Sequence, residues 1–305
     1  MTVPRAEAFE RLSREEHTAR KRTHRERLAP VVDSAIRRRS RGEKHPIEDF
    51  LWEYYGLRPG RLYHWSPGAG VILVDADETE FSDKAGYTEA PDGGRWIDPA
   101  SIPEKRRTTF RWIVNLLEKT RDRPPFYGCL GLHEWAMVYE IKDVRHPRLP
   151  LRLSHAETRR VVETLPMRCS HYDAFRFFSE SARHFNPVTL SPDTRPEQEQ
   201  PACLHANMDL LKWSLKIHPY LPAELIADAF ELALAARRID MRASPYDVTP
   251  LGEEPIRIET PEGRKAYVAA QQEIATRAAP VRERLIELLN GVIHVIDAVI
   301  LPPSE

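Results

Sequence analysis

The spacing of apolar residues predicts that most of this chain is helical. In residues 103–122 the apolar positions recur at intervals of three, one and three, which places them on one stripe of a helix: they are Phe110, Ile113, Val114 and Leu117. Residues 5–40 contain no glycine and a single proline, and their arginine, glutamate and alanine content favours one or two helices. Residues 222–244 and 262–300 are dominated by the same helical chemistry. We therefore expect helices to form most of the fold.

Strand-forming chemistry is confined to a short part of the chain. In residues 61–81 two strand-like runs flank the turn residues SPGAG, which predicts a hairpin, and the polar residues 82–103 are expected to form a surface loop. Residues 155–165 are expected to be helical because Ser154 and Glu157 form a capping-box pattern. The expected fold class is α+β, predominantly helical with a small β element, either a hairpin or a small sheet.

Length and composition narrow the class of protein. The chain has 305 residues, of which 41% are hydrophobic and 30% are charged, the balance of a soluble globular protein with a substantial core. No apolar run approaches the roughly 20 residues that span a bilayer, and the first residues lack the apolar segment of a secretory signal. Three cysteines without such a signal indicate reduced thiols. We therefore expect a cytoplasmic protein with no membrane partner.

Basic residues are concentrated near the N-terminus. The net charge of the whole chain is only −1, but residues 1–44 hold 13 lysines or arginines against 7 aspartates or glutamates. The densest part is a group of four arginines: Arg37, Arg38, Arg39 and Arg41. Such a run can follow a phosphate backbone, and the alternative is a solvated helical face that binds nothing. We expect residues 1–44 to form a basic helical extension ahead of a single domain, residues 45–305.

Every cysteine of the chain lies within four residues of a histidine. The pairs are Cys129 with His133, Cys169 with His171, and Cys203 with His205. Thiolate and imidazole are good zinc ligands, but zinc modules place two ligands on a short knuckle such as C-x-x-C, and the sequence has none. We therefore expect no metal, with the cysteines packed as small apolar side chains. A metal-dependent hydrolase that uses these cysteines and histidines is the alternative.

Each of the three histidines has a carboxylate close by in the sequence: Glu134, Asp173 and Asp209. If residues 204–216 form a helix, one stripe is apolar and another carries His205, Asp209, Lys212 and Lys216. That stripe is either a solvated face with a weak ion pair or one wall of a site. Imidazoles and carboxylates gathered in a pocket are suited to general acid and base chemistry. Three such pairs favour a single catalytic site.

Aromatic residues surround the same segments. Most of them are expected in the core, while some could form a slot that stacks a planar base. The sequence contains no Walker loop, no G-x-G-x-x-G and no G-x-S-x-G. It also lacks H-E-x-x-H, because Met137 stands where the second histidine would be needed. The chain therefore lacks the common sequence motifs of nucleotide-binding proteins, serine hydrolases and zinc metalloproteases.

Six stretches of the sequence resemble one protein family. They are HPIEDFLWEYYGLRPGRL, GCLGLHEWAMVY, RHPRLPLRL, RCSHYDAFRFF, EQPACLHANMDLLKW and DMRASPYDV. As a set they resemble bacterial, mainly actinobacterial, proteins labelled 3-methyladenine DNA glycosylase, over roughly residues 45–275. The chain has neither the helix-hairpin-helix signature of one alkylbase class nor the motifs of uracil-type enzymes. The resemblance implies an enzyme that flips a modified base out of DNA, without a cofactor or obligate protein partner, in repair or in defence against phage DNA with hypermodified bases.

The reaction that the resemblance implies sets the expected roles. Cleavage of an N-glycosidic bond passes through an oxocarbenium-like sugar that needs a carboxylate. The expected catalytic residues are Asp173, Asp209, Glu134 and His205. The expected base-pocket residues are His133, Trp135, His171, Tyr172 and Asn207. Phosphate contacts are expected from the N-terminal arginines and from Arg168, Arg176 and Arg242. A nucleic-acid-binding protein without catalysis is the remaining alternative.

Overall fold

The computed structural model describes the backbone of residues 9–91, 93–141 and 149–300, and side chains up to residue 294. It is predominantly helical with one small sheet, which confirms the expected fold class. The α-helices are α1 (Arg14–Ser40), α2 (Glu48–Tyr54), α3 (Glu104–Asp122), α4 (Leu132–Ala136), α5 (His155–Thr164), α6 (Tyr172–Phe175), α7 (Arg195–Gln198), α8 (Leu204–Ile217), α9 (Ala223–Ala243) and α10 (Pro261–Ile300). The strands are β1 (Arg11–Leu12), β2 (Ile72–Leu73), β3 (Thr88–Glu89) and β4 (Arg95–Trp96).

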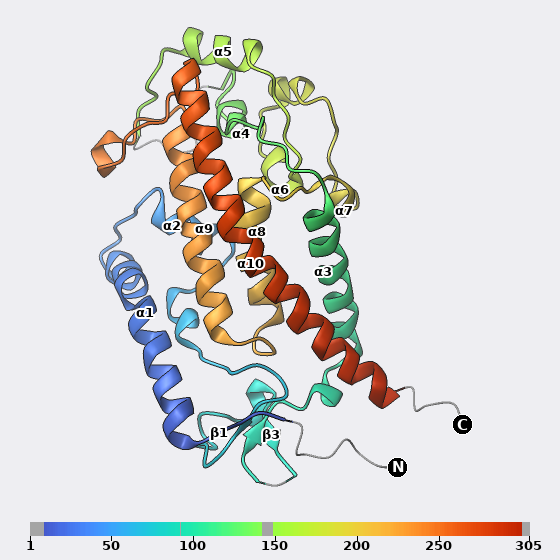
Figure 1. Cartoon of the computed structure of the whole chain (residues 1–305). Coiled ribbons are helices and arrows are strands. Elements are labelled where there is room, and N and C mark those ends of the chain that lie inside the picture. Colours follow the sequence, from blue (N-terminus) through green and yellow to red (C-terminus); the bar gives the residue numbers. More distant parts are fainter. Residues whose placement is uncertain (1–8, 92, 142–148, 301–305) are drawn as a thin grey trace.

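Helices α8, α9 and α10 form the centre of the molecule (Figure 1). Helix α9 packs against both α8 and α10, and α10 also packs against α3. Fully buried alanines on α9, among them Ala227, Ala233 and Ala236, let the neighbouring helices approach closely. The main apolar core lies between these helices. Within the described residues, no helix combines the length and the apolar character needed to cross a membrane.

Local sequence signals account for several helix positions. The apolar stripe predicted for residues 103–122 is buried on one side of α3. Helix α5 begins with the predicted capping box, in which the Ser154 hydroxyl accepts from the backbone N–H of Glu157. The stretch GCLGLHEWAMVY contains the short helix α4, which covers only Leu132–Ala136.

Helix α1 packs onto the rest of the molecule. Its residues Leu28, Val32 and Ala35 belong to the main apolar core, and Arg27 on the same helix forms ion pairs with α9. The boundary expected after residue 44 therefore falls between two helices, α1 and α2, that share one core. Residues 1–8 of the expected extension lie outside the described part of the chain, as do residues 145–148 at the start of the RHPRLPLRL stretch.

The sheet differs from the expected hairpin. Its strand order is β1-β2-β4-β3, with β1 parallel to β2 and the other pairs antiparallel. The run before the SPGAG turn forms a 3-10 helix at Pro59–Tyr63 rather than a strand, and residues 82–103, expected to be a loop, supply β3 and β4. Gly94 allows this pairing, because a Cβ there would lie 2.6 Å from the carbonyl oxygen of Leu73. Two-residue strands carry no alternation that a sequence pattern can reveal.

Candidate functional site

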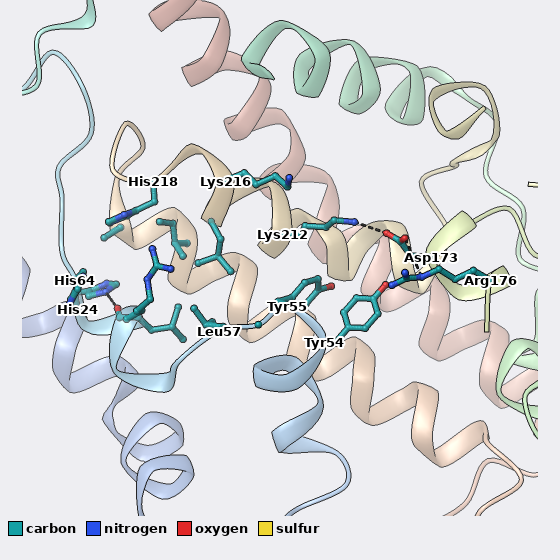
Figure 2. Close-up of a pocket in the computed structure, with 16 residues that line it drawn as sticks. His24, Tyr54, Tyr55, Leu57, His64, Asp173, Arg176, Lys212, Lys216 and His218 are labelled. Atoms are coloured by element: carbon teal, nitrogen blue, oxygen red, sulfur yellow. Dashed lines mark hydrogen bonds and ion pairs between the residues drawn. The ribbon is translucent and has the colours of Figure 1, made fainter. Parts of the chain in front are cut away.

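A cavity of about 460 Å³ opens between α1, α2, α6, α8 and α9. Its polar lining residues are His24, Tyr54, Tyr55, Arg61, His64, Asp173, Arg176, Lys212, Lys216 and His218. Figure 2 shows Asp173 and Arg176 at one end and the three histidines at the other, with the two tyrosines on the Asp173 side. The volume is within the usual range of ligand pockets, and the described lining is mostly basic and aromatic.

Helix α8 carries the predicted polar stripe from the core to this cavity. His205 and Asp209 are buried, Lys212 is partly exposed at the cavity wall, and Lys216 is exposed. Asp209 and Lys212 form an ion pair along this stripe, with Nζ 3.0 Å from Oδ2. The stripe is therefore not a solvated face, because its first half is shielded from water inside the protein.

Asp173 presents an ionised carboxylate at the cavity wall. Nζ of Lys212 and Nη2 of Arg195 donate to its Oδ2 at 2.5 Å and 2.8 Å, and Nε of Arg176 lies 3.6 Å from Oδ1. Burial alone would raise the pKa of Asp173, but the bond and charge of Lys212 and the charge of Arg195 lower it overall. Asp173 therefore stays negatively charged at neutral pH.

Tyr55 connects the cavity to a second ionised carboxylate behind its wall. The Tyr55 hydroxyl donates to Oδ1 of Asp209 at 3.0 Å. Burial raises the pKa of both Tyr54 and Tyr55, so their phenols remain neutral. Burial also opposes ionisation of Asp209, but hydrogen bonds from His171 and Lys212 lower its pKa overall. Asp209 thus acts on the cavity through Tyr55 and Lys212 rather than by lining it.

One buried imidazole, His24, and one partly buried imidazole, His218, offer acceptor nitrogens at the far end of the cavity. Nε2 of His24 lies 2.7 Å from the carbonyl oxygen of Leu62 and must donate to it, so Nδ1 is an acceptor, and it has no hydrogen-bond partner. Nε2 of His218 is likewise buried without a partner. Burial lowers the pKa of His24 and lowers the pKa of His218 to about 4, so both rings are neutral. A ligand with hydrogen-bond donors would satisfy both nitrogens.

His171 links Asp209 to a third carboxyl group, Glu199. Nε2 of His171 donates to Oδ2 of Asp209 at 3.3 Å and lies 3.5 Å from Oε1 of Glu199. Nε of Arg195 lies 3.3 Å from the same Oε1, but neither approach has hydrogen-bond geometry, so this buried oxygen is unsatisfied. Burial raises the pKa of Glu199 to about 7. Glu199 therefore holds its proton at pH values below about 7, at which Asp209 is already ionised.

A second buried polar cluster lies on the other side of His205. Nε2 of His133 is 2.7 Å from Oδ1 of Asp240, and Nη1 of Arg237 donates to Oδ2 of Asp240 and to Glu134 at 2.6 Å and 2.5 Å. The centroid of the His205 ring lies 4.4 Å from that of His133 and 5.4 Å from that of His171. Two sets of potential metal ligands result, each with its donor atoms within 4.8 Å: His133, His205 and Asp240, and His171, Glu199 and Asp209.

Of the nine expected catalytic and base-pocket residues, only Asp173 lines the cavity. Three of the others are held in the core away from it. Glu134 is paired with Arg237. Trp135 is fully buried and donates its ring N–H to the carbonyl oxygen of Ala243. Asn207, also fully buried, accepts from Arg282 and donates to the carbonyl oxygen of Pro201. Each is held by its own polar contacts, so none of the three faces the cavity.

The expected DNA-contacting arginines have different surroundings. Arg176 lines the cavity, while Arg168 lies over the ring of Phe126 and Arg242 donates to the carbonyl oxygen of Glu254. Arg38 forms ion pairs with Glu48 and Asp49 and is 14% exposed. The three neighbouring arginines are exposed at the C-terminal end of α1: Arg37, Arg39 and Arg41. Arg38 is therefore occupied within the fold, whereas these three are open to solvent.

Sequence reasoning missed several residues of the site: Tyr54, Tyr55, Arg195, Glu199, His24 and His218. A partial signal exists for the tyrosines, which end a helix just before Gly56. The others become site residues only through contacts between segments far apart in the sequence.

Comparisons of the chain with models of protein families, with curated proteins and with solved structures found no match.

Proposed function

We propose that this protein is a DNA glycosylase that flips a modified base into the cavity and hydrolyses its N-glycosidic bond. The observation that carries the proposal is an ionised carboxylate, Asp173, at the wall of a cavity whose other polar lining residues are arginine, lysine, histidine and tyrosine. The resemblance of six sequence stretches to proteins labelled 3-methyladenine DNA glycosylase points to the same chemistry. The proposed role is in repair of alkylated purines or in defence against phage DNA with hypermodified bases.

Asp173 is the proposed catalytic carboxylate. The bond to a departing base breaks through an oxocarbenium-like sugar, and a fixed negative charge beside that sugar stabilises it or activates the attacking water. The two cations on Oδ2 of Asp173 hold it in place, while Oδ1 has only the 3.6 Å contact with Arg176 among the contacts given above. Asp209 and His171 are positioning residues in this proposal, because they act on Asp173 through Lys212.

The rest of the cavity suits a flipped nucleotide. Tyr54 and Tyr55 supply aromatic surface next to Asp173, and stacking on such rings is a common way to hold an extruded base. The acceptor nitrogens of His24 and His218 would receive exocyclic amino or ring N–H groups of the base. Arg61, exposed Arg176 and Lys216 provide positive charge for the flanking phosphates.

A substrate screen tests the proposal. The purified protein is incubated with single- and double-stranded DNAs that carry alkylated, deaminated or hypermodified bases, and released base and abasic sites are both quantified. We expect excision from at least one class, with multiple turnovers. DNA binding without excision from any substrate would support a non-catalytic nucleic-acid-binding protein, and absence of both binding and excision would reject the proposal.

A further inference from the structure

Three donor side chains from three different helices meet in the core behind the cavity. His133 on α4, His205 on α8 and Asp240 on α9 bring their ligand atoms within 4.8 Å of one another. All three are buried, with exposed fractions of 2%, 6% and 0%. We propose that these residues form a binding site for a divalent transition metal of the zinc class, separate from the cavity proposed for DNA.

His205 provides an observation independent of the clustering. The His205 ring is a neighbour of the rings of His133 and His171, and its nitrogens form no hydrogen bond with the described residues. Coordination of a metal would give one of these ring nitrogens a partner.

The geometry around Asp240 fits a metal ligand with a supporting outer shell. Arg237 binds Oδ2 of Asp240 and leaves Oδ1 facing His133, while Nδ1 of His133 lies 4.0 Å from the sulfur of Cys129. Hydrogen bonds of this kind orient ligands in known metal sites. Two ligands about 2.1 Å from a zinc ion lie about 3 to 3.4 Å apart. The 2.7 Å between Nε2 of His133 and Oδ1 of Asp240 would therefore widen by a few tenths of an ångström.

The neighbouring set, His171 with Glu199 and Asp209, fits a metal less well. Nδ1 of His171 accepts from the backbone N–H of Ala174 at 3.3 Å, so the ring hydrogen resides on Nε2. That nitrogen donates to Asp209, as Nε2 of His133 does to Asp240, so in either set a metal would displace the ring hydrogen. The His171 set is less suited because two cations already occupy its carboxylates: Lys212 bonds Oδ2 of Asp209, and Nε of Arg195 lies 3.3 Å from Oε1 of Glu199. His171 is thus a matched control: a buried imidazole in the same core that is not expected to bind metal.

The donor set decides the class of ion and its role. Two imidazoles and one carboxylate favour zinc and similar transition metals over Mg²⁺ or Ca²⁺, which prefer oxygen ligands. None of the three ligands lines the cavity, so the ion would fix the relative positions of α4, α8 and α9. Because His205 and Asp209 are four residues apart on α8, one turn of the helix connects the metal site to the carboxylate behind the cavity.

Metal content of the full-length protein tests this proposal. The protein is stripped with a chelator, reloaded with Zn²⁺, freed of unbound ion by gel filtration and subjected to elemental analysis, with folding checked by circular dichroism. We expect about one zinc per chain for the wild type and for His171→Gln, and loss of the bound zinc in His205→Gln. X-ray absorption of the zinc-loaded wild type should show only nitrogen and oxygen neighbours.

Several outcomes would overturn the assignment. Folded wild-type protein that retains no zinc would reject the site. Equal zinc in wild type and His205→Gln, or loss in His171→Gln alone, would place the ion elsewhere. Zinc–sulfur scattering at about 2.3 Å would assign the metal to the cysteines instead. If His205→Gln does not fold, the absorption spectrum of the wild type decides, because it needs no variant. Excision by metal-free protein would leave the proposed glycosylase function intact.

Discussion

Asp173 and Asp209 share one cation. Oδ2 of each carboxylate accepts from Nζ of Lys212, at 2.5 Å and 3.0 Å respectively. Burial opposes the ionisation of both groups, yet the pKa of each is lowered, and Lys212 contributes to both shifts. A lysine between two buried carboxylates thus connects the cavity wall to the polar core.

Replacement of Lys212 by methionine tests this connection. The change leaves two buried carboxylates without their shared partner, so we expect a loss of about 2 kcal/mol in the free energy of unfolding at pH 7. The pKa values of Asp173 and Asp209 should rise. A carboxylate with a lowered pKa stabilises the folded state at pH values above its unfolded-state pKa, and this stabilisation is lost as the pH falls. The difference in the free energy of unfolding between Lys212→Met and wild type should therefore shrink below about pH 4.

Urea unfolding at several pH values provides the measurement for Lys212→Met. Lys216→Met is the matched control, since Lys216 is exposed one turn further along α8 and should leave stability nearly unchanged. A pH-independent difference between Lys212→Met and wild type would show that the lysine does not hold the two carboxylates ionised.

The positions of several helices were predictable from the sequence because local patterns determine them. The apolar stripe of α3 and the capping box of α5 each depend on residues within a few positions of one another. The sheet was not predictable, since its strands have two residues each and β2 pairs with β1, a segment about sixty residues earlier in the chain. Strand pairing at that distance leaves no periodic signal.

The candidate site was predictable only along α8. Spacing correctly placed His205, Asp209 and Lys212 on one stripe, but it could not show that the stripe faces inward or that His171 meets it. The expectation that no metal binds rested on the lack of a short cysteine and histidine knuckle. Such a search cannot detect the ligands proposed above, which lie on three separate helices.

His218 and Glu199 should make opposite contributions to the pH dependence of stability. The pKa of His218 is lowered to about 4, so protonation of the unfolded chain removes about 3 kcal/mol of stability as pH falls from about 6.5 to 4. The pKa of Glu199 is raised to about 7, so the folded state binds the extra proton. Ionisation of Glu199 in the unfolded chain removes about 3 kcal/mol of stability as pH rises from about 4.5 to 7.

Two substitutions separate these contributions. Relative to wild type, His218→Gln should lose stability as pH rises from 4.5 to about 6.5, whereas Glu199→Gln should gain stability over the same range. Chemical unfolding at each pH gives both difference curves. Parallel curves for the two variants would contradict the assigned protonation states.

The exposed arginines of α1 are expected to contact DNA phosphates. Alanine at Arg37, Arg39 and Arg41 together should weaken DNA binding and reduce the slope of log affinity against log salt by up to about 0.9 for each arginine. Arg38 is left in place, because its ion pairs with Glu48 and Asp49 belong to the fold. The measurement is fluorescence anisotropy at several salt concentrations.

A control for this experiment removes positive charge elsewhere. Arg277 and Arg284 are exposed on α10, and their replacement by alanine should leave the salt dependence nearly unchanged. Equal slopes of log affinity against log salt for the wild type and the triple alanine variant would show that the N-terminal arginines form a solvated face that does not contact DNA.

We propose that Asp173 is the carboxylate that supports cleavage of the glycosidic bond. Asp173→Asn keeps the shape of the side chain but removes its charge, and it is compared with Asp83→Asn, whose side chain is 84% exposed in the wild type. The decisive measurement is the single-turnover rate of base excision on the best substrate from the screen, with DNA affinity and thermal stability measured in parallel. We expect a rate about 10² to 10⁴ times lower for Asp173→Asn, with DNA binding retained, and an unchanged rate for Asp83→Asn. Excision by folded Asp173→Asn at the wild-type rate would contradict this proposal.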